Sequence, residues 1–186
     1  MNLEIRIAET EEEKKKIYQL RYKVYVEEMN RPCHADHENK VLTDWLDETG
    51  VLLYAIDKGK NEFVATLRLN FRKHGVIEFE KEYNIESFKE YYPNNISTST
   101  KLIILKDYRK TKLPLNIICF GYNCCMENGS MLDFINVNAP LDKFYWKLGY
   151  KCYKENFNHP EFGEVIPMVL HRDDFKYKKY PRTTRV

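Results

Sequence analysis

Two arginines lie in segments whose other residues are mostly apolar. Arg21 falls on the apolar face of a predicted helix, and Arg68 interrupts an apolar strand run. A guanidinium group is costly to bury unless an acid pairs with it, so we expect Arg68 to form an ion pair with Asp44 or Asp47. Arg21 is in an unusual place for a merely solvated charge. The four residues could form a structural network that pins the polar loop 27–43 to a sheet.

A tyrosine also lies in residues 138–150, the second stretch whose residue types could contribute to catalysis. Pro140 suits the first position of a helix, and Gly149 suits the positive φ that follows a last helical turn. Between them, one apolar face is predicted from residues spaced at i, i+3, i+4 and i+7: Leu141, Phe144, Tyr145 and Leu148. A strand over 150–154 should follow. Periodicity alone makes Tyr145 a core-facing helix residue.

Other reactive residues show no complete pattern. Cys33-His34-x-x-His37 lacks the second ligand pair of a structural zinc site, so we predict no metal. Cys125, Ser130 and His171 form no motif of a nucleophilic triad. Five cysteines without a repeating spacing suggest free thiols.

Length and charge narrow the class of protein. A chain of 186 residues is expected to form one domain, 1–186, and a net charge of +2 argues against a nucleic-acid surface. We see neither a signal peptide nor an apolar segment of membrane-spanning length, and therefore expect a cytoplasmic protein. The basic stretch 176–185 is expected to be a solvated terminus.

The predicted elements alternate between strands and helices. Thr10 and Glu13 form a capping box for a helix over 11–26, and a second helix over 113–128 ends at Gly129. The segment 76–92 is ambiguous, and a short strand followed by one or two helical turns around 85–91 is one interpretation. Strands are predicted over 2–8, 51–57, 62–71, 96–105, 131–137 and 165–170. The pattern by itself gives an α/β or α+β protein.

The stretch that contains Tyr145 resembles the closing motif of the GCN5-related N-acyltransferases (GNAT). The similarity rests on N-A…F-Y-x-K-L-G-Y, from Asn138 to Tyr150. It implies a GNAT fold, in which a mixed central sheet is flanked by helices and two central strands splay apart to admit the pantetheine arm of an acyl donor. It also implies that Tyr145 protonates the departing thiolate.

The N-terminal half resembles the autoinducer (acyl-homoserine-lactone) synthases and the long-chain N-acyl amino acid synthases, which are bacterial enzymes. The matches are Arg21-x-x-Val24-Tyr25, Asp44-x-x-Asp47 and Ala65-Thr66-Leu67-Arg68-Leu69, and the runs 160–163 and 166–170 look like the second group. The resemblance implies an acceptor site for a small-molecule amine, formed by Arg21, Tyr25, Asp44, Asp47 and Arg68. It implies an acyltransferase with no permanently bound cofactor, whose co-substrate is acyl-phosphopantetheine on acyl carrier protein or acyl-coenzyme A.

The donor side departs from the GNAT pattern. Lys112 and Pro114 stand where the family has the glycines of its pyrophosphate loop, and Pro114 cannot donate an N–H. A donor without adenosine pyrophosphate, carried by an acidic acyl carrier protein, would suit a loop that keeps three cations. By resemblance, the donor side comprises Leu102, Ile103, Ile104, Leu105, Arg109, Lys110, Lys112 and Asn138.

The position of the general base also departs from the family. Autoinducer synthases carry a glutamate where this chain has Thr98. A water relayed through Thr98 or Ser99 could replace it, Glu78 or Glu80 could supply the carboxylate, or the reaction could be lost. The prediction is therefore an N-acyltransferase that moves an acyl group, long-chain by resemblance, from acyl carrier protein to an amino acid. The alternatives are an acetyl-coenzyme A-dependent N-acetyltransferase and an inert acyl- or carrier-binding module.

Overall fold

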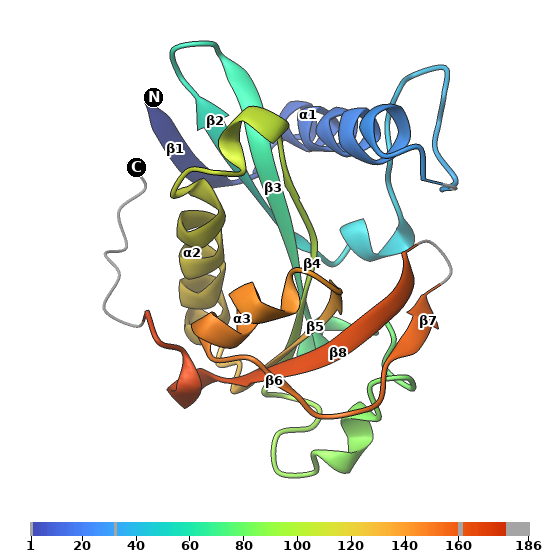
Figure 1. Cartoon of the computed structure of the whole chain (residues 1–186), viewed down its shortest axis with the longest axis vertical. Coiled ribbons are helices and arrows are strands. Elements are labelled where there is room, and N and C mark those ends of the chain that lie inside the picture. Colours follow the sequence, from blue (N-terminus) through green and yellow to red (C-terminus); the bar gives the residue numbers. More distant parts are fainter. Residues whose placement is uncertain (1, 32, 160–161, 178–186) are drawn as a thin grey trace.

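A mixed sheet forms the centre of the computed structural model, which describes residues 2–31, 33–159 and 162–177. Its strands follow the order β1-β2-β3-β4-β5-β8-β6, and β7 also pairs with β8 (Figure 1). β4 and β5 are parallel, and the other pairs are antiparallel. The strands are β1 (Leu3–Ile7), β2 (Val51–Asp57), β3 (Glu62–Phe71), β4 (Ile96–Ile104), β5 (Leu132–Asn138), β6 (Lys151–Cys152), β7 (Phe157–His159) and β8 (Gly163–His171).

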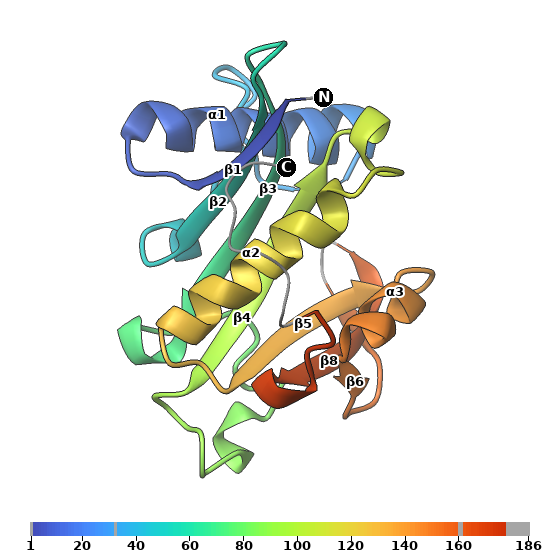
Figure 2. The ribbon, with the colours of Figure 1, turned by 90° about the vertical axis from the view of Figure 1, so that its left-hand side faces the viewer.

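Within the described residues, three α-helices cover the sheet: α1 (Glu11–Tyr22), α2 (Leu113–Glu127) and α3 (Asp142–Leu148). Successive side chains of β2 point to opposite faces of the sheet. Leu52 and Tyr54 pack with α1, whereas Leu53 and Ala55 pack with α2, so the two helices lie on opposite faces of the sheet. α3 packs beside α2 over β5 and β8. Figure 2 shows α2 crossing one face of the strands obliquely, with α3 beside β5 and β8.

The start of α1 follows its predicted capping box. The Thr10 side chain accepts a hydrogen bond from the Glu13 N–H at 3.2 Å, and the Glu13 carboxylate accepts one from the Thr10 N–H at 3.0 Å. The end differs from the prediction, because the α-helix stops at Tyr22 and continues as a π-helical segment, η1 (Lys23–Glu28). The spacing of apolar residues does not reveal a π-helical turn, which holds about one more residue than an α-helical turn. Such turns are frequent at functional sites.

β4 and β5 splay apart, as the GNAT resemblance implies. They pair only from Ile96 with Leu132 to Thr98 with Phe134, although both strands continue beyond these residues. β4 also contains a bulge, since its register with β3 shifts between Thr66 and Arg68 and Lys101 adopts a φ of +53°. A bulge leaves one residue out of the ladder and bends the strand. The gap and the bulge therefore lie at the same level of the sheet.

Several predicted boundaries need correction, including a one-residue trim at each end of β1 (Leu3–Ile7) and an extension of β8 to Gly163–His171. Pro140 lies in the turn before α3 rather than in its first turn, because Leu141 caps a helix that begins at Asp142. The strand predicted over 150–154 is limited to β6, since Tyr150 instead turns into the core. β4 ends one residue earlier and β5 one residue later than predicted.

The segment 76–92 forms no strand. It contains turns and one short 3₁₀ helix, η4 (Ile85–Ser87), and its buried residues Ile77, Tyr83 and Ile85 cover the β4–β5 pair. Further 3₁₀ turns are η2 (Trp45–Asp47), η3 (Arg72–His74), η5 (Lys106–Tyr108) and η6 (Arg172–Asp174). Strand β7 was not predicted, because its three residues are too short to show a period.

Three parts of the sequence analysis fall wholly or partly on residues outside those described: Pro32 in the loop 27–43, Pro160 and Glu161 in the run 160–163, and 178–185 in the basic stretch. Within the described residues, no helix combines the length and the apolar character needed to cross a membrane. The same residues contain no cluster of three or more His, Cys, Asp or Glu side chains arranged to hold a metal ion.

Candidate active site

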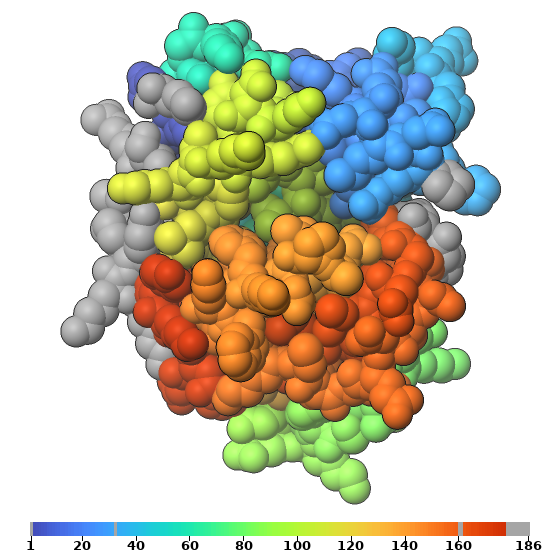
Figure 3. All heavy atoms as spheres, in the orientation of Figure 1, coloured from blue at the N-terminus to red at the C-terminus, as the bar shows by residue number. Residues whose placement is uncertain are grey.

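A cavity of about 490 Å³, a size in the range of small-molecule sites, borders β4 beyond the residues that pair with β5. Apolar side chains from η1, β4, α2 and α3 line it, and Arg109 and Thr111 add polar groups. Figure 3 shows the hollow between the end of α1 in blue, the start of α2 in yellow-green and the α3 region in orange. Leu141, 53% exposed, is part of this wall, which explains an apolar side chain at the surface.

Tyr145 stands between this cavity and a smaller interior one of about 30 Å³. Its ring meets the ring of Tyr150 edge-on, with the centroids 5.5 Å apart. Burial raises the pKa of the Tyr145 hydroxyl above its ordinary value. The hydroxyl is therefore protonated at neutral pH.

A buried network of charges lies on the α1 side of the sheet. Asp47 accepts two hydrogen bonds of 2.8 Å from Arg21 Nη1 and one of 3.1 Å from Arg68 Nη1. Arg68 also pairs with Asp44, donates from Nε to Thr100 Oγ1 at 3.0 Å, and lies 3.4 Å from a Glu78 carboxylate oxygen. Both predicted partners of Arg68 are confirmed.

The network also orders the chain locally. Asp44 caps the 3₁₀ helix η2, and the Asp47 carboxylate accepts a hydrogen bond from the Asp44 N–H at 2.9 Å. Burial opposes ionisation of Asp44, but the attraction of Arg68 and Lys101 outweighs it and holds the pKa of that carboxyl below its usual value. Arg21 Nε and Nη2 have no hydrogen-bond partner within the described ranges, so this buried network has donors left for a ligand or water.

The mouth of the cavity is closed on one side by an ion pair. The two terminal nitrogens of Arg109 donate to the two carboxylate oxygens of Glu28 at 2.6 and 2.9 Å, which lowers the pKa of Glu28. Arg109 Nε donates to the Ile104 carbonyl at 2.8 Å. Arg109 thus joins the end of β4 to the end of η1.

The first turn of α2 has few free N–H groups. The Leu113 N–H donates to Thr111 Oγ1 at 3.1 Å, and Pro114, the next residue, has none. An anion site at a helix N-terminus needs such groups. Leu113 and Pro114 therefore add no free N–H to an anion site at this end of α2.

The predicted donor residues divide into two groups. Leu102, Ile103, Ile104 and Arg109 line the cavity. The remaining four lie outside its wall: Leu105, Lys110, Lys112 and Asn138. Lys110 and Lys112 are exposed beside its mouth, and the Asn138 side-chain amide donates to the Phe162 carbonyl at 3.0 Å.

The substitutes proposed for the missing glutamate lie in different surroundings. Thr98 is fully buried, and its hydroxyl has no hydrogen-bond partner in the described part of the chain. Glu78 belongs to the Arg68 network, whereas Glu80 pairs with Arg72 Nε at 2.7 Å. Of the two glutamates, only Glu78 lies with the predicted acceptor residues.

Two features of the site were not predicted. The Asp133 carboxyl, buried on the α2 side, accepts hydrogen bonds from Ser97 at 2.8 Å and Tyr150 at 2.6 Å, and burial raises its pKa. Arg31 and Lys101 both lie over the rings of Tyr25 and Phe162 on the α1 side. No sequence pattern marks Asp133 or Arg31, because the contacts come from distant segments.

Comparison with known proteins identifies the family. The family described as N-acyl amino acid synthase FeeM matches residues 16–173, which is most of the chain. The chain belongs to the FeeM family of N-acyl amino acid synthases. It is therefore an acyltransferase, as the sequence predicted. No curated protein matches the chain significantly.

Solved structures show that this FeeM family member has the GNAT fold. FeeM from uncultured soil microbes superposes with a TM-score of 0.75 at 10% identity, over 97% of this chain and 99% of that one. BjaI, a CoA-dependent acyl-homoserine lactone synthase, gives 0.70 at 14% identity, over 91% and 83%. An acyl-CoA N-acyltransferase from Pseudomonas aeruginosa gives 0.63 at 15% identity, over 91% and 99%.

Proposed function

We propose that this protein transfers an acyl group from the phosphopantetheine of an acyl carrier protein to the amine of an amino acid. The carrying observation is the apolar cavity of about 490 Å³ that borders β4 beyond the residues that pair with β5, with Tyr145 at its inner end. A thioester arm can enter such a cavity and bring its carbonyl to the bulge at Lys101. FeeM is named for N-acyl amino acid synthesis, which supports an amino acid as the acceptor.

The donor side favours a carrier protein over coenzyme A. In the first turn of α2, Leu113 and Pro114 offer no free N–H to a pyrophosphate, and the guanidinium of Arg109 is already paired with Glu28. Lys110 and Lys112 remain exposed at the mouth, where they could attract an acidic carrier protein at long range. BjaI is described as CoA-dependent, so a protein of this fold can use coenzyme A, and the transfer assay below distinguishes the two donors.

The reaction needs one base and one acid. A base takes a proton from the acceptor's ammonium group, and the amine nitrogen bonds to the thioester carbon. The C–S bond breaks as the thiolate takes the proton of the Tyr145 hydroxyl, and the tyrosinate regains a proton from the same nitrogen, which loses its second proton as the amide forms. We assign the base to Glu78, which lies 3.4 Å from Arg68, or to a water relayed through Thr98. A backbone N–H released by the bulge at Lys101 would stabilise the oxyanion.

The acceptor would lie against the charged network on the α1 side. We propose that Arg21, Asp44, Asp47 and Arg68 shape this side and that Tyr25, which also lines the donor cavity, separates the two substrates. The network also orders the η2 turn, so its structural and substrate roles are compatible.

One observation favours a short acyl group. The interior cavity beyond Tyr145 measures only about 30 Å³, which is the space of roughly one water molecule. An acetyl group from coenzyme A has only two carbons and needs little room beyond Tyr145, whereas a long chain would have to remain in the outer cavity or open the interior one. This keeps an acetyl-coenzyme A-dependent N-acetyltransferase as the second candidate.

The test is a transfer assay with purified protein and a mixture of the twenty amino acids. Donors are acetyl, octanoyl and hexadecanoyl groups, each supplied on acyl carrier protein and on coenzyme A, and products are identified by mass. We expect kcat/KM to be at least about tenfold higher for a carrier-protein donor, because the pyrophosphate contacts are missing. Faster transfer from acetyl-coenzyme A would establish the second candidate, and absence of transfer from every donor would refute both.

A further inference from the structure

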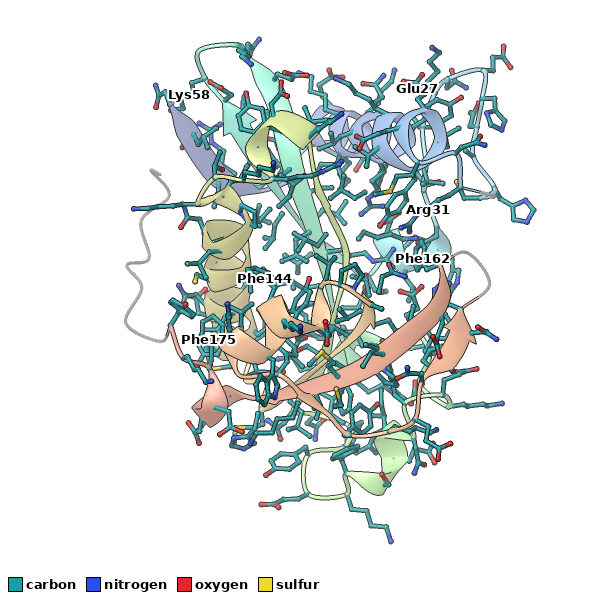
Figure 4. All side chains as sticks on the ribbon, in the orientation of Figure 1. Glu27, Arg31, Lys58, Phe144, Phe162 and Phe175 are labelled. Atoms are coloured by element: carbon teal, nitrogen blue, oxygen red, sulfur yellow. The ribbon has the colours of Figure 1, made fainter. Side chains whose placement is uncertain are left out.

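Arg31 lies over two aromatic rings beside the donor cavity. Its guanidinium carbon is 4.8 Å from the centre of the Tyr25 ring and 4.4 Å from that of Phe162. The backbone N–H of Arg31 donates to the Tyr25 carbonyl at 2.9 Å. Figure 4 labels Arg31 next to Phe162, where the chain after η1 meets the start of β8. Stacking on the two rings fixes the plane of the guanidinium and leaves its edge to other partners.

Other arginines around the cavity have acidic partners, and Arg31 has none among the described residues. Arg21 pairs with Asp47, Arg68 with Asp44 and Asp47, and Arg109 with Glu28. Arg31 is half-buried and makes no ion pair within 2–31, 33–159 and 162–177. A guanidinium that is stacked and partly removed from water is a ready site for a carboxylate, which it can bind through two parallel hydrogen bonds.

A second cation, Lys101, lies over the same two rings. Lys101 Nζ lies 5.8 Å from the centre of the Tyr25 ring and 5.7 Å from that of Phe162, and it is 3.3 Å from Asp44 Oδ2. Arg31 is thus directly beside the proposed acceptor network. In the cluster formed by Arg21, Arg31, Arg68 and Lys101 with Asp44, Asp47 and Glu78, four cations face three carboxylates.

The neighbouring histidine adds no compensating charge. His159 stacks on Phe162 with the ring centroids 4.1 Å apart. Burial lowers its pKa to about 4, and the positive charges of Lys101 and Arg31 act in the same direction. At neutral pH the ring is therefore uncharged and adds no further positive charge to the cluster.

We propose that Arg31 binds the carboxylate of the acceptor and thereby selects amino acids over simple amines. The proposal rests on the proposed function, whose amino acid acceptor it deepens. With its carboxylate on Arg31 and its side chain against Phe162, an amino acid would point its amine past Tyr25 toward the thioester. Tyr25 contacts Arg31 and also lines the donor cavity. The Arg31 guanidinium and the donor cavity therefore lie within the length of one small molecule.

The test compares an acceptor with its decarboxylated counterpart. Phenylalanine and phenethylamine, and leucine and 3-methylbutylamine, differ within each pair only in the carboxylate. Kinetics are measured with the best donor from the transfer assay, for the wild type and for Arg31→Gln. We expect Arg31→Gln to raise KM for the amino acid about 10- to 100-fold, the equivalent of one charged hydrogen-bonded contact, and to change KM for the amine by less than about twofold.

Arg72→Gln is the matched control, because Arg72 also lies over a tyrosine ring, at 5.3 Å from Tyr92, but far from the cavity. It should leave the preference for amino acids unchanged. The role of Arg31 is refuted if Arg31→Gln raises KM equally for both members of a pair, raises only the donor KM, or changes neither. The proposed function survives that result as long as the wild type still transfers acyl groups. Absence of transfer by the wild type to either member would refute the proposed function and this inference together.

Discussion

The two faces of β4 hold buried charge in opposite ways. On the face toward α1, Arg68 lies among three carboxylates and is joined by Arg21 and Lys101, so every buried acid of this network has a cation beside it. On the face toward α2, Asp133 is buried with hydroxyl donors, Ser97 and Tyr150. One strand therefore separates a paired ionic cluster from a carboxyl that has only neutral donors bonded to it.

The difference shows in the direction of the pKa shifts. Burial works against ionisation on both faces, but on the α1 side the attraction of Arg68 and Lys101 exceeds it, and the pKa of Asp44 falls. On the α2 side the hydroxyl donors do not compensate for burial, and the pKa of Asp133 rises. The first face suits binding of charged groups, and the second suits an apolar arm.

The largest expected effect comes from breaking the α1-side network at its centre. Arg68→Met leaves Asp44 and Asp47 buried with one cation fewer each, and we expect it to lower the free energy of unfolding by about 3–5 kcal/mol. Urea unfolding monitored by circular dichroism measures this. Arg6→Met removes an exposed ion pair with Glu4 and serves as the control, with little expected change. A loss below about 1 kcal/mol for Arg68→Met would show that the network contributes little to stability.

The next effect lies at the gap where the two faces meet. Tyr145→Phe removes the proposed proton donor and keeps the ring, so we expect kcat to fall about 100-fold with donor KM little changed. Tyr122→Phe is the control, because its hydroxyl donates to the Arg172 carbonyl away from the outer cavity. If Tyr145→Phe turns over as fast as the wild type, the thiolate takes its proton from another donor.

The pH dependence of the free energy of unfolding distinguishes the two faces. Asp44, with its pKa below the ordinary 3.8, contributes stability that is present above that value and is lost as the pH falls through its folded pKa. Asp133, with a raised pKa, contributes stability that is present below 3.8 and is lost as the pH rises through its folded pKa. Unfolding curves of Asp44→Asn and Asp133→Asn across this range should therefore diverge from the wild type with opposite slopes. Parallel curves would contradict the contrast between the faces.

Sequence patterns predicted most of the elements, because local signals set them. The Thr10–Glu13 capping box, the positive φ of Gly149 and the pairing of Arg68 with Asp44 and Asp47 all follow from residues whose conformation or burial leaves few options. The π-helical end of α1 and the three-residue β7 were missed, since neither has a period that a sequence can show.

The site was predicted less completely than the fold. Arg31 and Phe162 are separated by more than a hundred residues and meet only because η1 and the start of β8 adjoin. Arg109 shows a different limit, because its sequence position suggests phosphate binding while its partner Glu28 comes from another element. Contacts between segments decide what a cation is available to bind, and one sequence does not specify them.

The smallest predicted effect concerns the pair at the rim of the cavity, between the end of η1 and the end of β4. Glu28 and Arg109 are each about one-third exposed, so Glu28→Gln should reduce the free energy of unfolding by less than about 1 kcal/mol, and added salt should shrink the difference. The substitution releases the Arg109 guanidinium while its Nε remains bonded to the Ile104 carbonyl. If Arg109 binds the donor phosphate, donor KM should then fall about two- to threefold, and Lys40→Gln, which removes the exposed partner of Glu27, should leave it unchanged. A rise in donor KM instead would mean that the ion pair itself shapes the entrance, and that the phosphate is bound elsewhere.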